Sequence, residues 1–221
     1  LNTPTEQTTN KPISLNSPKG DIKFDNVSFK YTPNSNLVLK NLSFEIKSGK
    51  SVGIVGRSGS GKTSFTMKLC KELAKYGKIA YNSLEEGFSL TMKNALMKAG
   101  MQDVARRFIL ISESMEDLDA RLKKRKSPDI VVIDSFQYTQ MSFKEYQEFK
   151  ARHRDKLLIF ISQADGNKPS GRTAVSVMFD AALKIWVEGY RAISKGRYFG
   201  NLGYYTIWKE RADIYWGETK E

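Results

Sequence analysis

The residues best suited to chemistry lie in a glycine-rich loop, "GRSGSGKTS", at residues 56–64. An apolar run, "SVGIV", precedes this loop and an amphipathic stretch, "TSFTMKLCKELAKYG", follows it, so the loop connects a predicted buried strand to a predicted helix. Gly56, Gly59 and Gly61 allow sharp turns that direct backbone N–H groups toward a ligand, and a helix beginning near Lys62 adds the positive end of its dipole. The loop therefore predicts a site for phosphate groups.

The spacing makes this prediction more specific. Gly56 is followed by four residues and then by Gly61, Lys62 and Thr63, which is the Walker A pattern. We expect Lys62 to contact the β- and γ-phosphates of ATP or ADP and Thr63 to offer its hydroxyl to Mg²⁺. The rest of the predicted phosphate cradle consists of Arg57, Ser58, Gly59, Ser60 and Ser64.

Other polar residues follow predicted strands. Asp134 ends "PDIVVID", Glu85 and Glu86 follow "KIAYNSL", and Gln163 follows "LLIFIS". Because the carboxyl ends of parallel strands share one edge of a sheet, we expect these side chains to converge on Lys62. Asp134 is predicted to hold magnesium through water, one of the two glutamates to orient the attacking water, and Gln163 to sense the γ-phosphate. The alternatives are an acidic pair at a helix N-terminus and an ordinary loop glutamine.

The elements that must position these residues predict an α/β fold. Apolar runs at 79–84, 108–112, 130–134 and 157–162, separated by amphipathic stretches, indicate parallel strands beside the loop strand. Alternating runs at 21–31 and 37–49 indicate an N-terminal antiparallel hairpin, and residues 179–208 indicate closing antiparallel strands. We therefore expect a mainly parallel sheet flanked by helices, in a single domain that spans residues 21–221.

Composition limits the class of protein. The 221 residues include Cys70 as the single cysteine, which argues against a disulfide framework and suits a reducing, cytoplasmic compartment. No apolar run approaches the length of a membrane span and no signal-peptide pattern is present. Residues 1–20, rich in Thr, Asn, Pro and Ser, predict a flexible linker, and Leu1 in place of Met suggests a processed fragment. The single histidine, His153, is predicted to be a solvated surface residue.

The formal net charge of +12 is concentrated in three basic clusters, at 120–126, 150–156 and 191–197. One interpretation is an anionic polymer partner such as single-stranded DNA. The other is a set of helix faces that meet solvent. The residue pattern leaves both open.

The first part of the chain resembles the nucleotide-binding domain of an ATP-binding cassette (ABC) exporter of the haemolysin or bacteriocin type. The resemblance is carried by "GDIKFDNVSFKYTPNSNLVLKNLSFEIKSGKSVGIVGRSGSGKT", residues 20–63. It implies that Tyr31 stacks on the adenine ring, the alternative being an ordinary strand aromatic. After the loop, the "LSGGQ" signature and the switch histidine of that family are missing, and Ser135 stands where its catalytic glutamate would be.

Residues 64–221 instead resemble a RecA-like ATPase core, especially its RadA branch. "KIAYNSLEEG", "PDIVVIDSFQ" and "LLIFISQADG" are similar to its core strands, and "KGRYFG" is similar to a Lys-Asn-Arg-Phe-Gly motif of that branch, with Gly196 in place of Asn and an inserted aromatic residue. The resemblance implies self-association, with Lys195 or Arg197 acting on the nucleotide of a neighbouring subunit.

These two resemblances suggest a chimera joined inside the Walker A motif, either engineered or a natural recombinant. The expected function is ATP binding with weak Mg²⁺-dependent hydrolysis, since the N-terminal elements that RecA-like proteins use to dock onto neighbours are replaced. The alternatives are a non-catalytic nucleotide- or phosphate-binding scaffold and a DNA-dependent ATPase of recombination or repair.

Overall fold

The computed structural model describes residues 22–29, 39–46, 49, 51–195 and 203–218. The predicted linker at 1–20, Tyr31 and Arg197 lie outside these residues.

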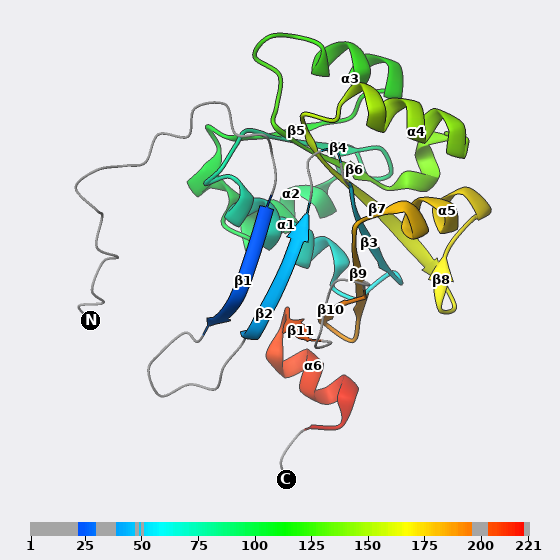
Figure 1. Ribbon diagram of the computed structural model, residues 1–221. Helices are drawn as coiled ribbons and strands as arrows, with labels where there is room; N and C mark the ends of the chain where they lie inside the picture. The colour runs from blue at the N-terminus through cyan, green and yellow to red at the C-terminus, as the bar shows by residue number, and fades with distance from the viewer. Residues whose placement is uncertain (1–21, 30–38, 47–48, 50, 196–202, 219–221) are drawn as a thin grey trace.

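A mixed sheet, drawn through the centre of Figure 1, forms the core of the fold. Its strand order is β11-β10-β9-β3-β7-β6-β4-β5, with a short strand, β8, paired to β7. The bounds are β3 (Ser51–Gly56), β4 (Ile79–Ser83), β5 (Phe108–Ile111), β6 (Ile130–Asp134), β7 (Leu157–Asp165), β8 (Lys168–Pro169), β9 (Leu183–Glu188), β10 (Arg191–Ser194) and β11 (Tyr204–Thr206). Strands β9, β3, β7, β6, β4 and β5 are parallel neighbours, whereas β10, β11 and β8 pair antiparallel. The predicted α/β fold with a mainly parallel sheet is confirmed.

The predicted N-terminal hairpin is also present. Strands β1 (Ile22–Phe29) and β2 (Leu39–Ile46) pair antiparallel in a two-stranded sheet of their own. Figure 1 shows this pair in blue.

Helices cover both faces of the sheet because its central strands are apolar on both sides. The helices and 3₁₀ turns are α1 (Lys62–Leu73), α2 (Leu90–Lys98), η1 (Met101–Val104), α3 (Met115–Leu122), η2 (Phe136–Thr139), α4 (Phe143–Arg152), α5 (Arg172–Asp180) and α6 (Lys209–Trp216). In β6, Ile130 and Val132 pack with α1 and α2, whereas Val131 and Ile133 pack with α3, α4 and α5. The alternation of the strand thus builds two separate apolar layers.

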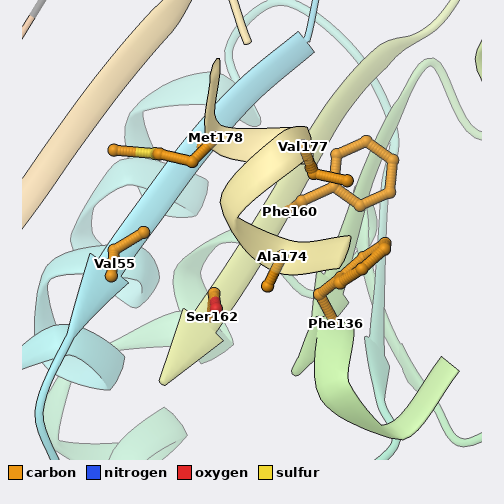
Figure 2. A pocket seen from close by; sticks show the side chains of 8 residues that line it. Val55, Phe136, Phe160, Ser162, Ala174, Val177 and Met178 are labelled. Atoms are coloured by element: carbon orange, nitrogen blue, oxygen red, sulfur yellow. The ribbon is translucent and has the colours of Figure 1, made fainter. Parts of the chain in front are cut away.

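The packing under α5 leaves only a very small cavity, of about 10 Å³, between this helix, β3 and β7. Figure 2 shows Ala174, Val177 and Met178 of α5 above Val55 and Ser162. A Cβ atom at Gly53 would lie 3.0 Å from the Met178 sulfur, so a larger residue there would displace this side chain slightly. The cavity holds about one water molecule at most and is a packing gap.

The prediction of a solvated His153 was wrong. His153 is the C-cap residue of α4 and is only 3% exposed. Its ring packs edge-on against Phe149, with 4.8 Å between the ring centroids, and its Nε2 lies 2.8 Å from Asp119 Oδ1. The neighbouring Arg152 donates to the same Asp119 oxygen at 2.9 Å, although its side chain is 44% exposed, so the charge of the neighbours did not indicate that the ring of His153 is buried.

The interpretation of the basic clusters as solvated helix faces holds only in part. The cluster at 120–126 is mostly outside α3, which ends at Leu122. In the cluster at 150–156, Lys150 is paired with Asp180, and Arg152 contacts Asp119. Within the described part of the chain, no helix is long and apolar enough to cross a membrane.

Candidate functional site

The glycine-rich loop connects β3 to α1 at the carboxyl edge of the parallel strands. Gly59 and Gly61 have φ angles of 76° and 93°, in the left-handed region that side chains rarely adopt. Gly56 is required for a different reason, because a Cβ atom there would lie 2.6 Å from the carbonyl oxygen of Val187. The loop is held against the sheet by Tyr190, whose N–H donates to the carbonyl of Ser60 at 3.1 Å.

Lys62 is the first residue of α1 and turns its amine back into the loop. Its Nζ donates to the carbonyl oxygens of Gly56, at 3.3 Å, and Ser162, at 3.4 Å. Burial lowers the pKa of Lys62, and the negative charges of Asp134 and the two glutamates oppose that shift. The amine thus has long, neutral hydrogen-bond partners, which a phosphate oxygen could replace with a stronger charge-assisted bond.

Asp134 ends β6 beside β4, as predicted. Burial raises the pKa of Asp134, which the hydrogen bond from the Tyr81 hydroxyl and the charge of Lys62 partly offset. Tyr81 is fully buried in β4, and burial together with this carboxylate raises the pKa of its hydroxyl well above the usual range. Tyr81 therefore acts as a hydrogen-bond donor that fixes one oxygen of Asp134.

Glu85 is brought beside Asp134 by the backbone. The carbonyl of Asp134 accepts the N–H of Leu84 at 2.6 Å and that of Glu85 at 3.3 Å. The Glu85 Oε1 in turn accepts a hydrogen bond of 2.6 Å from Gln163 Nε2. Both side chains come from the carboxyl edge, so the structure brings together Lys62, Asp134, Glu85 and Gln163.

Both alternatives for these polar residues are contradicted. Helix α2 begins at Leu90 and its N-cap is Ser89, so Glu85 and Glu86 lie before the helix and outside its first turn. Glu86 instead accepts a hydrogen bond of 3.3 Å from the Ser89 hydroxyl. Gln163 belongs to β7, which continues to Asp165, and is not a loop residue.

The other predicted loop residues differ in exposure. Arg57, Ser58, Gly59 and Ser64 are exposed, and Gly61, Lys62 and Thr63 are half-buried. Ser60 is buried, and its hydroxyl oxygen has no hydrogen-bond partner among the described residues. The guanidinium of Arg57 donates to the carbonyl of Gly166 at 3.4 Å, across the mouth of the loop.

Lys195 follows β10, whose last residue, Ser194, pairs with Ile185 of β9. Its amine lies 4.7 Å from the centre of the Trp186 ring. A role for Lys195 at the nucleotide of a neighbouring chain stays a prediction.

Sequence reasoning missed three residues that shape this site. Tyr81 was counted as part of an apolar strand, although a tyrosine two residues before the end of a strand that neighbours Asp134 could have signalled a hydrogen bond. Gln137, in η2, donates to the Ser170 carbonyl at 2.9 Å and accepts from the N–H of Gln163 at 3.3 Å, so it fixes the backbone beside that residue. Tyr190 lies against Gly61, and no local pattern around it indicates this long-range contact.

The donor set fits Mg²⁺ bound together with a nucleotide. Within the described ranges, no group of three or more His, Cys, Asp or Glu side chains could hold a metal ion alone. Mg²⁺ commonly takes one or two protein oxygens, with phosphates and water as its other ligands. The Thr63 hydroxyl would supply one such protein oxygen, and the Asp134 carboxylate would hold the ion through water.

Comparison with known proteins agrees with the loop chemistry. The sequence pattern of the ABC transporter family matches residues 39–154. The "Leukotoxin translocation ATP-binding protein LktB" of Mannheimia haemolytica and that of Bibersteinia trehalosi are each 51% identical to this chain over 69 residues. That stretch is 31% of this chain and 10% of each relative, so the chain matches only about a tenth of those proteins.

Proposed function

This chain belongs to the ABC transporter family, and from that premise we propose that it binds ATP or ADP with Mg²⁺ at the loop of residues 56–64 and hydrolyses ATP slowly. The observation that carries the proposal is the convergence of a lysine, a half-buried aspartate and a hydrogen-bonded glutamate at one edge of the sheet. Family membership supports nucleotide binding, and the geometry supports the assignment of roles.

The residues have separate tasks in this proposal. The loop N–H groups and Lys62 would hold the phosphates, with Lys62 exchanging its carbonyl partners for phosphate oxygens. Mg²⁺, held by Thr63 and Asp134, would neutralise charge on the phosphate oxygens. Glu85 would accept a hydrogen bond from the attacking water, and Gln163 would orient that carboxylate.

We propose weak activity because Ser135 replaces the catalytic glutamate that ABC family members have at this position. Ser135 follows Asp134, is fully buried, and leaves its hydroxyl without a partner among the described residues. A serine cannot act as a carboxylate base, so we infer that the general base comes from the segment after β4, as the RecA-like resemblance implies. Glu85 is the candidate there.

We also propose that residues 64–221 form a RecA-like core joined to an ABC-type N-terminal part. The support is the set of strand sequences that follow the loop, the missing "LSGGQ" signature and Ser135. The ABC family match, however, crosses the proposed junction at residue 63 and continues to residue 154. We therefore test this hypothesis through its consequence for catalysis. It predicts that hydrolysis depends on Glu85 and needs no carboxylate at position 135, where the ABC family has its catalytic glutamate.

The test is phosphate release from Mg-ATP by the wild-type chain and by Lys62→Ala, with and without single-stranded DNA. We expect slow release that depends on Mg²⁺ and falls at least about 100-fold in the variant, since one stabilising charge on the transferred phosphate is lost. Stimulation by DNA would add the recombination-type alternative.

The control is Lys93→Ala, which removes an exposed lysine of α2 that has no salt-bridge partner in the described part of the chain. Equal release by the wild type and Lys62→Ala would identify a contaminating ATPase and contradict hydrolysis at the loop. Binding of nucleotide without any release would select the non-catalytic scaffold instead.

A further inference from the structure

A second feature with ligand-binding chemistry lies at the amino edge of the parallel strands, opposite the nucleotide loop. It is a hollow of about 210 Å³, whose wall is formed by the residues that enter β4, β5 and β6 and by the end of α3. Because β4 has 5 residues, the length of the sheet separates the two edges by about 16 Å. The hollow is therefore distinct from the site of Lys62.

The wall of this hollow is strongly basic. Its cationic side chains are Lys78, Arg106, Arg107, Arg121, Lys124 and Lys126. They come from separate segments of the chain, which the parallel topology places side by side at the starts of neighbouring strands. A basic wall assembled from distant segments cannot be explained as one solvated helix face.

Two of these cations already have hydrogen-bond partners within the protein. Arg121 forms a bidentate pair with Glu113, and Arg107 donates to the carbonyl oxygens of Ala74, at 3.1 Å, and Lys75, at 3.0 Å. These contacts fix the two guanidinium groups as parts of the wall.

The remaining cations have no such partners. Within the described residues, Lys78, Arg106, Lys124 and Lys126 have no carboxylate within salt-bridge distance. All of them are exposed, so they carry hydrated charges that a ligand can approach. Like charges around one hollow repel one another, and an anion between them relieves that repulsion.

The acidic groups nearby do not cancel this field. Glu113 is neutralised by Arg121, whose hydrogen bond is the main reason that its pKa is lowered. One carboxylate oxygen of Asp129 accepts a hydrogen bond of 2.9 Å from the backbone N–H of Lys78. The hollow therefore keeps a net positive charge.

We propose that this hollow binds an anion with several phosphate charges, independently of the nucleotide loop. Its other wall residues include Ile79, Ile109, Pro128 and the hydroxyl of Ser127, and no aromatic side chain that could stack on a base. Recognition therefore rests on phosphate groups alone. An inorganic polyphosphate and the backbone of single-stranded DNA both present this chemistry.

The test measures binding of inorganic tripolyphosphate by calorimetry and of a labelled oligothymidylate by fluorescence anisotropy. Both titrations use Lys62→Ala, so that the nucleotide loop contributes little. In that background we compare K124Q/K126Q with K93Q/K98Q, a matched pair that removes the same charge from exposed lysines of α2 outside the hollow. We expect roughly a tenfold or greater weakening only in K124Q/K126Q, since direct charge contacts are lost.

The two probes separate the sources of the anion. Tripolyphosphate binding without oligothymidylate binding would identify a small polyphosphate as the ligand, whereas binding of both would indicate a nucleic-acid backbone. Equal weakening in the two double variants would show only general charge and would overturn the proposal. So would complete loss of both probes in Lys62→Ala alone, because the loop would then be the only anion site.

Discussion

The two edges of the central sheet differ in how their charges are arranged. At the carboxyl edge, Lys62 lies among Asp134, Glu85 and Glu86, and hydrogen bonds fix most of these groups. At the amino edge, the cations of the hollow outnumber the carboxylates, and the lysines are exposed and unpaired within the described chain.

This difference in charge arrangement suits one edge to catalysis and the other to ligand binding. Charges of both signs that are held by hydrogen bonds can bind a metal–phosphate complex and direct a water molecule, which requires fixed geometry. Exposed cations without carboxylate partners attract any polyanion but do not position reacting atoms. The carboxyl edge is thus the candidate for catalysis and the amino edge the candidate for retention of an anionic ligand.

The largest expected effect within the carboxyl edge comes from Glu85→Gln. If Glu85 is the general base, phosphate release should fall about 100-fold or more, while the dissociation constant for ATP changes less than about threefold. The matched control is Glu86→Gln, because the hydrogen bond of the Glu86 carboxylate among the described residues is with the Ser89 hydroxyl, whereas that of Glu85 is with Gln163. A larger loss of phosphate release in Glu86→Gln than in Glu85→Gln would contradict this assignment and make Glu86 the general base.

A smaller change is expected from Tyr81→Phe. The lost hydrogen bond stabilises ionised Asp134, so its removal should raise the already elevated pKa of this carboxyl further. Magnesium binding needs the ionised form, and activity should therefore be lost at a higher pH in the variant as the solution is acidified. The pH profile of phosphate release measures this shift. An acidic limb that stays in place or moves to lower pH would contradict the role given to Tyr81.

The smallest effect concerns stability at the amino edge, where Asp119 neutralises one group of cations. Although partial burial opposes its ionisation, hydrogen bonds from Lys123, Arg152 and His153 together lower the pKa of Asp119 far below its usual range. Its stabilisation is therefore present above the unfolded pKa, about 3.9, and is lost as the pH falls toward the folded value. Asp119→Asn should lower the free energy of unfolding by about 1–3 kcal/mol at neutral pH.

Urea unfolding at neutral and acidic pH measures this effect, with Asp103→Asn as the control. Asp103 pairs with Lys71 at 2.7 Å but is 61% exposed, so solvent screening limits its contribution to about 1 kcal/mol at most. The deficit of Asp119→Asn should shrink below about pH 4. A deficit that is equal at both pH values would mean that packing, and not charge, is lost.

The sequence was informative where local spacing determines chemistry. The Walker A loop, its flanking strand and helix, and Asp134 at the end of an apolar run follow from short patterns, and so do the parallel strands. Tyr81, Gln137 and Tyr190 could not be predicted because their contacts join residues far apart in the chain. His153 was misassigned because neighbouring charges do not show which side of a helix end faces the core, and the hollow is visible only once β4, β5 and β6 lie side by side.

The most direct measurement is calorimetric titration of Mg-ATP into the wild-type chain, Lys62→Ala and K124Q/K126Q. The account predicts that Lys62→Ala weakens nucleotide binding at least about 100-fold, since the charge that contacts the phosphates is removed, and that K124Q/K126Q retains the tight site. Tight Mg-ATP binding that survives Lys62→Ala but is lost in K124Q/K126Q would place the nucleotide at the amino edge and contradict the central claim.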